Sequence, residues 1–514
     1  MKTIFLIIPL SIFFFIDSFS QATITMLSQN SLGGTLDEFS PSIAKAKNGG
    51  YVIASWSEST DKDLPGNIGS YDFWVTKVND TGTVVWSKNF GGSSRDQSTQ
   101  IIALKNGGYV IVGLTLSTDS NVKNNNGVQD AWMIKVSESG SLLWAKCFGG
   151  PLEESFNCVL ELDGGQLLAI GYTSSTTGQV SGNHGAKDLW VVKTDSTGNF
   201  LWQKCYGGTS DELGYSACLS PSANTIFIGG IANSSNGDLT ANKGGSDGWI
   251  LKIDTAGTLL NQINTGGTMD DLILSVAPKA DGGCLIAGYS QSSSGDVPSN
   301  KGSNDVWFAR FGRTLSHIWS KAVGGTLSDY ASGIAELSNG RILVAGAAQS
   351  NDNDFSGNKG AFDMMVLITD SNGNTLGNKL YGGNFSEYST TLVLDNDTCF
   401  TLVCNAASSN GDVVFNNGGN DIWFVKMKTN ALQGGGPVGL NSTQANNKVY
   451  PNPFSSSLNI NLSADVSYFI YNSSGQRVFT YTPENANPIN TADWPCGLYL
   501  LVDEKGTTIK LLKQ

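Results

Sequence analysis

Acidic side chains recur at fixed places along most of the chain, and they are the residues best suited to chemistry. One set stands five residues after the first Gly of a Gly-Gly pair and comprises Glu38, Asp96, Glu154, Glu212, Asp271, Asp329 and Glu387. A second set opens a later apolar segment and comprises Asp72, Asp130, Asp188, Asp247, Asp305, Asp363 and Asp421. Alternate connections of an antiparallel meander emerge at the same end, so both sets should share one face. The sequence therefore predicts an acidic rim, where carboxylates could bind a cation or a ligand, or act in hydrolysis. The alternative is that the first-strand acids are structural and lock neighbouring repeats together.

Calcium is the one cofactor that this pattern leaves open. Carboxylate and amide oxygens suit calcium, and two polar loops supply them at Asp238, Asn242, Asp247, Asp296, Asn300 and Asp305. Their spacing matches no EF-hand loop, and Asp and Asn also cap tight turns by accepting backbone N–H bonds. Because every repeat has the same residues, capping is the more economical interpretation.

One tryptophan departs from the repeats. Most tryptophans recur at equivalent positions, as Trp74 and Trp132 do, and their recurrence indicates packing. Trp56 occurs in one repeat only, so it is the candidate for stacking on a ligand, with an ordinary core residue as the alternative.

Four cysteines also follow the repeats. Cys147 and Cys205 stand two residues before Gly-Gly, and Cys158 and Cys218 stand in the next apolar segment. Since both members of each pair occur together, the sequence predicts disulfides Cys147–Cys158 and Cys205–Cys218, provided that their Cα atoms lie within ~7 Å.

The elements that must position these residues are β-strands. Gly-Gly pairs begin at Gly33, Gly91, Gly149, Gly207, Gly266, Gly324 and Gly382, which gives a repeat of 58 or 59 residues. Each repeat holds four short apolar segments separated by Gly, Asn and Ser turns, as expected for a four-stranded antiparallel meander. Seven such units predict an all-β, seven-bladed β-propeller over residues 21–431. The last unit lacks its fourth strand, and we expect residues 23–32 to supply it and close the ring.

Composition and the N-terminal residues limit where the protein is located and what it binds. Residues 1–20 combine a basic start, an apolar run and small residues before Gln21, which predicts a secretory signal peptide. We expect no membrane-spanning segment in the mature chain. The net charge of −13 argues against nucleic acid as a partner, and two histidines exclude a multi-histidine metal site.

The repeat resembles a known family. Asp130 to Lys135, Gly140, Trp144, Gly149-Gly150 and Glu154 together resemble the bacterial SBBP repeat, which implies a β-propeller of exported and surface proteins. That resemblance implies little about activity.

The last segment has a different register and a more specific resemblance. After a linker at 432–448, residues 449–514 hold short strands that predict a small Ig-like β-sandwich. This segment resembles the C-terminal sorting domain of the type IX (Por) secretion system of Bacteroidetes. The matching residues are Tyr450, Pro451, Asn452, Pro453, Gly475, Gly497, Tyr499, Lys510 and Lys513. The resemblance implies the secretion machinery as a partner and a secreted or cell-surface location.

Three functions fit the sequence. We favour a non-catalytic binding or adhesion module for a polysaccharide or a surface protein, because a rigid scaffold with variable loops builds binding surfaces. The alternatives are a polysaccharide hydrolase or lyase that uses the rim carboxylates and a quinoprotein-like oxidoreductase.

Overall fold

A computed structural model describes residues 22–221, 224–430, 448–450, 456–461, 468–472, 476–481, 488–495, 497–503 and 508–513. The predicted signal peptide and most of the predicted linker lie outside the described residues. The chain divides into two compact units, Met1–Leu432 and Gln433–Gln514, which are called unit 1 and unit 2 below.

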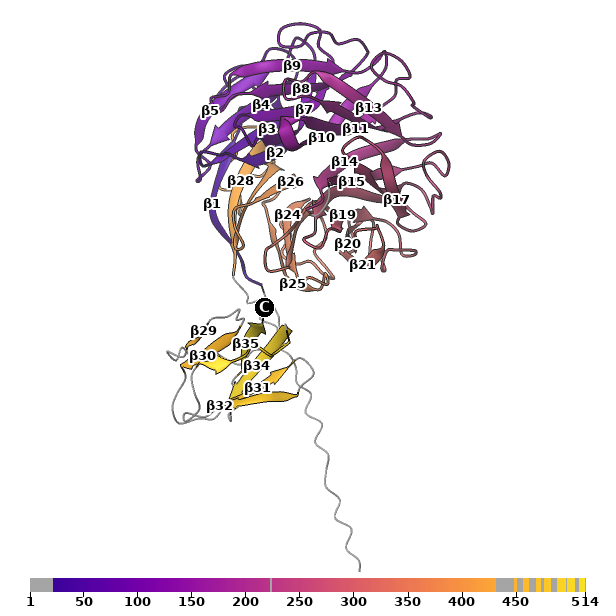
Figure 1. Ribbon diagram of the computed structural model, residues 1–514. Coiled ribbons are helices and arrows are strands. Elements are labelled where there is room, and N and C mark those ends of the chain that lie inside the picture. Colours follow the sequence, from indigo (N-terminus) through magenta and orange to yellow (C-terminus); the bar gives the residue numbers. More distant parts are fainter. Residues whose placement is uncertain are drawn as a thin grey trace, which may run out of the picture. The chain divides into compact units, whose positions relative to one another are not determined.

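Unit 1 is built from four-stranded antiparallel sheets that follow one another along the chain (Figure 1). The sheets are β2 (Glu38–Lys45), β3 (Tyr51–Ser57), β4 (Asp72–Val78), β5 (Val84–Phe90); β6 (Asp96–Ala103), β7 (Tyr109–Thr115), β8 (Asp130–Val136), β9 (Leu142–Phe148); β10 (Glu154–Glu161), β11 (Leu167–Thr173), β12 (Asp188–Thr194), β13 (Phe200–Tyr206); β14 (Glu212–Leu219), β15 (Thr225–Ala232), β16 (Asp247–Asp254), β17 (Leu259–Thr265); β18 (Asp271–Pro278), β19 (Cys284–Ser290), β20 (Asp305–Phe311), β21 (His317–Val323); and β22 (Asp329–Glu336), β23 (Ile342–Ala348), β24 (Asp363–Thr369), β25 (Thr375–Tyr381). A single 3-10 turn, Asp163–Gly165, is the only helical element among the described residues.

The last sheet of unit 1 joins the two ends of that unit. Strands β26 (Glu387–Leu394), β27 (Cys399–Ala406) and β28 (Asp421–Thr429) are completed by β1 (Ile24–Leu32). The pairing of β1 with β28 is antiparallel and runs from Ile24 opposite Thr429 to Leu32 opposite Ile422. The expectation that an N-terminal strand completes the last repeat is confirmed.

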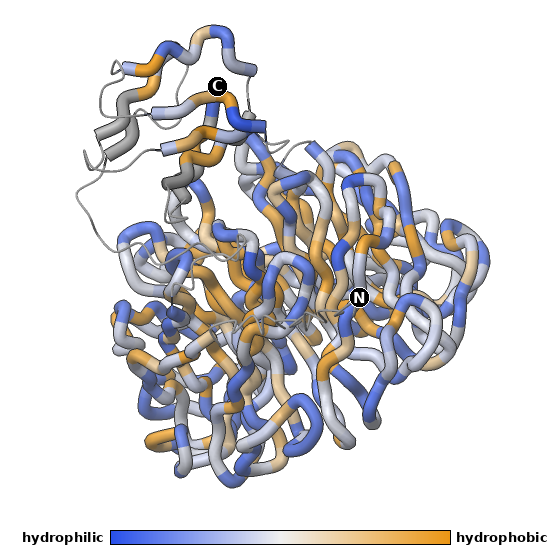
Figure 2. Tube along the Cα trace, turned by 90° about the horizontal axis from the view of Figure 1, so that it is seen from below, coloured by the Kyte–Doolittle hydropathy of each residue, from blue (hydrophilic) through white to orange (hydrophobic). Residues whose placement is uncertain are grey.

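The cores of unit 1 lie between sheets. The second and third strands are almost fully buried, as β7 and β8 illustrate, because each sheet is covered on both faces. One cluster unites Val52 and Phe73 of one sheet with Trp132 and Ile134 of the next, and another unites Ile43 with Val403 of the last sheet. In Figure 2 the apolar residues accordingly gather in the strands and the polar ones in the connections.

The first strands of the sheets contact one another in succession. We use "first strands" for β2, β6, β10, β14, β18, β22 and β26, each of which follows a Gly-Gly pair. Each contacts the next, and β26 also contacts β2. This succession gathers residues from distant parts of the chain around one place.

The described residues of unit 2 form two sheets. The smaller is β29 (Lys448–Tyr450), β30 (Ser457–Asn461) and β33 (Ile489–Asn490), and the larger is β31 (Tyr468–Asn472), β32 (Arg477–Tyr481), β34 (Gly497–Asp503) and β35 (Thr508–Lys513). Leu458 and Ile489 of the smaller sheet share a core with Ile470 and Leu511 of the larger one.

Candidate functional site

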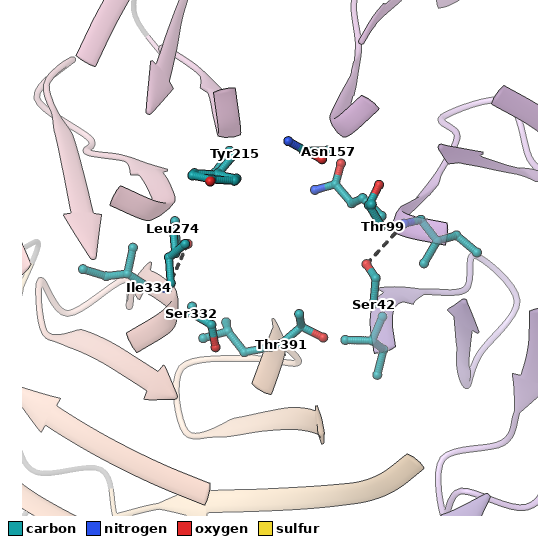
Figure 3. A pocket seen from close by; sticks show the side chains of 15 residues that line it. Ser42, Thr99, Asn157, Tyr215, Leu274, Ser332, Ile334 and Thr391 are labelled. Carbon is teal, nitrogen blue, oxygen red and sulfur yellow. Dashed lines mark hydrogen bonds between the residues drawn. The ribbon is translucent and has the colours of Figure 1, made fainter. Parts of the chain in front are cut away.

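A cavity of about 250 Å³ lies where the first strands meet. The side chains of Figure 3 surround it and come from all seven first strands, from Ser42 on β2 to Thr391 on β26. The fifteen lining residues are uncharged, and most carry a hydroxyl or an amide. A cavity of this kind suits a neutral ligand that has many hydrogen-bonding groups.

A β-bulge in each first strand positions these side chains. In five sheets the pairing with the second strand skips one residue, and those residues are Thr99, Asn157, Tyr215, Leu274 and Ser332. All five line the cavity. A bulge leaves one residue unpaired and changes the direction of its side chain, so the bulges present these five residues to the cavity.

The bulge side chains also tie neighbouring first strands together. The Thr99 hydroxyl donates to the Phe156 carbonyl at 2.7 Å, and the Asn157 amide donates to the Gly214 carbonyl at 2.8 Å. Burial raises the pKa of Tyr215 to about 12, with Tyr289 and Tyr172 nearby as smaller causes. Tyr215 is therefore a neutral phenol over the physiological range.

Our sequence reasoning missed the cavity residues. The signal was present, because Thr99, Asn157, Tyr215, Leu274 and Ser332 occupy one repeat position whose residue type changes from repeat to repeat. Residues that recur from repeat to repeat mark the scaffold, and this position does not recur.

The predicted acidic rim is wrong. All seven first-strand acids, Glu38, Asp96, Glu154, Glu212, Asp271, Asp329 and Glu387, are fully buried. Each accepts a hydrogen bond from the N–H of the second Gly of its Gly-Gly pair, at 2.6–2.9 Å. These acids fix the connection between sheets. Because they are buried, they cannot be the exposed carboxylates that the hydrolase alternative requires.

The loop residues proposed for calcium do not converge either. Asp238 accepts from Gly207 N at 3.1 Å, while the Asn242 amide donates to Gly245 O at 2.9 Å. Asp247 accepts from Lys243 N, and the Lys243 ammonium pairs with Asp296 of the following loop.

The second loop follows the same scheme. Asn300 donates to Ser290 O at 2.7 Å, and Asp305 accepts from Lys301 N at 2.9 Å. In the described part of the chain, no group of three or more His, Cys, Asp or Glu side chains could hold a metal ion. The capping interpretation accounts for these loops.

The predicted disulfides are also wrong. Cys147, Cys158, Cys205 and Cys218 are free thiols, and Cys147 and Cys158 belong to different core clusters. Cys147 lies on β9, the outermost strand of its sheet, whereas Cys158 lies on a first strand, and the same holds for Cys205 and Cys218.

Trp56 lies at the end of β3, outside the core clusters of unit 1. It is half-buried, and its ring contacts Phe39 at 4.5 Å and Tyr71 at 4.8 Å between centroids. The structure therefore places it in a group of three partly exposed aromatic rings.

The sorting residues are described only in part. Pro451, Asn452, Pro453 and Gly475 lie outside the described residues, whereas Tyr450, Gly497 and Lys510 lie within strands β29, β34 and β35. Tyr499 is buried and donates a hydrogen bond to Pro495 O at 2.8 Å, and Lys513 is also buried.

Residues 448–514 match a family described as "Secretion system C-terminal sorting domain". The chain thus carries an export signal at its C-terminus. This domain directs the protein across the outer membrane by the type IX system, to the cell surface or the medium. The secretion machinery is accordingly one of its partners.

One curated protein matches part of the chain. The chain is 24% identical over 257 residues to "Regulatory protein FlaEY" of Caulobacter vibrioides, which covers 43% of this chain and 26% of that protein. The chain thus spans about a quarter of the length of that relative.

Solved structures resemble the chain weakly. They include a Dyadobacter fermentans protein of unknown function (12% identity, TM-score 0.41, 79% of this chain and 99% of that one). The Neurospora crassa Pan2 WD40 domain follows (10% identity, TM-score 0.45, covering 79% and 96%). A DUF4221 member from Bacteroides vulgatus has 10% identity and a TM-score of 0.36, covering 80% and 99%. Among the described residues, no helix is both long and apolar enough to cross a membrane.

Proposed function

We propose that unit 1 is a seven-bladed β-propeller of SBBP type that acts as a non-catalytic binding module for a polysaccharide outside the cell. Its blades are the seven four-stranded sheets, and unit 2 is the Ig-like sorting sandwich of a Bacteroidetes protein. The module is carried to the cell surface or the medium by that sandwich.

One observation carries the binding role. The side chains that the bulges turn into the cavity vary from repeat to repeat, while the residues that cap, pack and pair the sheets recur. Variation at a position that lines the cavity favours side chains that serve a ligand rather than the scaffold.

The chemistry of the cavity favours a saccharide. Uncharged hydroxyl and amide groups match the hydroxyl groups of a sugar, and no lining charge is left unpaired when such a ligand enters. A charged protein loop would bury its charges without partners in the same cavity.

The test uses the secreted chain in a glycan-array screen, followed by calorimetry with the best oligosaccharide. We expect Asn157→Ala to weaken binding about tenfold, since a lost buried hydrogen bond costs about 1–2 kcal/mol. Lys105→Ala is the matched control, because its exposed side chain follows the far end of β6, a strand that also lines the cavity.

Two results would overturn the proposal. Release of reducing ends from any polysaccharide would show catalysis, and equal affinities of the Asn157 variant and the control would place the ligand elsewhere. If the chain binds a surface protein and no glycan, the ligand is a protein and not a polysaccharide.

A further inference from the structure

A second contact surface lies on the first sheet, and it departs from the repeat. Phe39 on β2 lies opposite Trp56 on β3. The same register position holds Gln97 and Leu114, Ser155 and Tyr172, Leu213 and Ile231, Leu272 and Tyr289, Tyr330 and Ala347, and Tyr388 and Asn405 in the other sheets. Two facing aromatic rings occur in the first sheet alone, so the scaffold does not require them.

Tyr71 completes a group of three rings. The Tyr71 ring meets the Trp56 ring edge to face at 89°. The Phe39 ring lies tilted against the Trp56 ring. All three side chains stay partly exposed. Among the described residues the indole N–H of Trp56 has no hydrogen-bond acceptor, and neither have the buried indole N–H groups of Trp132, Trp144 and Trp319. An indole with a free N–H and a partly exposed ring is suited to a ligand.

Charged groups border the three rings. The Glu58 carboxylate beside the Tyr71 hydroxyl raises the pKa of Tyr71, and Arg95 and Asp37 lie close enough to influence it. The Arg95 guanidinium donates to Gln97 Oε1 at 2.5 Å and is itself exposed. A wholly apolar ligand would bury Glu58 and Arg95 without partners, which is costly. A sugar ring would instead lay its C–H face on Trp56 and offer hydroxyls to both charges.

We propose that Phe39, Trp56 and Tyr71 form a stacking platform for one sugar ring of a polysaccharide, with Glu58 and Arg95 binding its hydroxyls. This inference rests on the proposed function, because it assumes the same ligand class. The platform and the cavity share a strand: Phe39 precedes Ser42 on β2 by three residues, which is at most ~10 Å because β2 bulges between them. A single oligosaccharide of several units therefore spans the two sites.

The experiment measures the affinity of the secreted chain for cellohexaose, xylohexaose, laminarihexaose and mannohexaose by calorimetry. We expect Trp56→Ala to weaken the best of these about tenfold, the loss of one aromatic contact, and Trp56→Phe to recover part of it. Tyr289→Ala is the matched control, because Tyr289 holds the Trp56 position in another sheet. Thermal unfolding of each variant shows whether it has folded.

The outcomes separate the two proposals. If no hexasaccharide and no arrayed glycan binds the unmodified chain, both proposals fail. If Asn157→Ala weakens binding and Trp56→Ala leaves it unchanged, the platform is wrong and the cavity stands. If a folded Trp56→Ala weakens binding no more than Tyr289→Ala, the platform is likewise overturned. Should Trp56→Ala fail to fold, Glu58→Gln and Arg95→Ala test the same site, and unchanged affinity in both overturns it.

Discussion

Asp421 and Glu38 come from opposite ends of unit 1 and face each other across Gly33. A Cβ atom placed on Gly33 would overlap an oxygen of each carboxyl group. Glu38 is saturated with donors, since it accepts from Gly34 N at 2.9 Å and from the Ser57 hydroxyl at 2.6 Å. Asp421 accepts from Asn417 N, and its fully buried Oδ1 has no hydrogen-bond partner. This arrangement favours Asp421 over Glu38 as the acid that is protonated, and burial raises the pKa of Asp421 to about 7.

The same arrangement recurs where each sheet meets the next. The Oδ1 atoms of Asp72, Asp130, Asp188, Asp247, Asp305 and Asp363 are likewise buried without a partner. Burial raises the pKa of Asp72, Asp130, Asp247, Asp305 and Asp363 to about 6 and that of Asp421 to about 7, and a neighbouring acid adds to the rise at Asp421.

The first prediction concerns pH. A carboxyl group whose pKa is raised on folding stabilises the fold below its unfolded pKa near 4, and this stabilisation is lost as pH rises through the folded pKa. Six such groups act together, so we expect Tm to fall between about pH 5 and pH 8. Exposed Asp195, whose pKa is lowered by its turn, affects only more acidic solutions. Calorimetry across this range checks it, and a Tm that rises toward pH 8 contradicts it.

The second prediction concerns Asp421 itself. Asp421→Asn keeps an acceptor for Asn417 N and removes the need for a proton, so we expect near-normal stability at pH 5 and a weaker decline toward pH 8. Asp421→Ala removes the acceptor and should cost about 1–3 kcal/mol. Urea unfolding at both pH values measures the effects, with exposed Asp397→Ala as the control. A decline in Asp421→Asn as steep as in the unmodified chain would place the proton elsewhere.

The third prediction concerns Gly91, which lies between Asp72 and Asp96. A Cβ atom there would overlap Asp72 Oδ1 and lie 2.7 Å from Asp96 Oδ2. We expect Gly91→Ala to lower the free energy of unfolding by about 1–3 kcal/mol through overpacking. Gly164→Ala controls for backbone strain alone, because Gly164 has φ +76° and open space around it, and should cost about 1 kcal/mol. Equal losses in both variants would refute the steric argument.

The fourth prediction concerns the thiols. Burial raises the pKa of Cys147 and Cys158 to about 12, so both remain protonated and react slowly with iodoacetamide in the folded protein. We expect complete labelling in urea without any reductant and a Tm that dithiothreitol leaves unchanged. Peptide mass spectrometry maps the labelled sites. If Cys147 or Cys158 is labelled only after a reductant is added, the residue is in a disulfide and this prediction is wrong.

The sequence predicts the frame of unit 1 well because the frame repeats. Gly-Gly pairs, turns and apolar segments placed the four-stranded sheets and the strand supplied by β1. Burial was harder to predict, since Glu38 and Asp421 are acids that end up fully buried, and only their hydrogen bonds to backbone N–H groups make that tolerable. The disulfide between Cys147 and Cys158 is wrongly predicted because residues that are close in sequence lie on opposite edges of two successive sheets. The place of Tyr215 in the cavity could not be predicted, because a bulge shifts the register by one residue and has no strong sequence signature.

The pairing of β1 with β28 also decides when the protein can finish folding. Synthesis delivers β1 first, and it delivers its partner Asp421–Thr429 only after every other strand of unit 1. Contacts between such distant segments form slowly, because a long loop must close first. The edge of β28 stays available to other chains until then. Completion of the last sheet is therefore the final step in the folding of unit 1, and it covers the edge of β28.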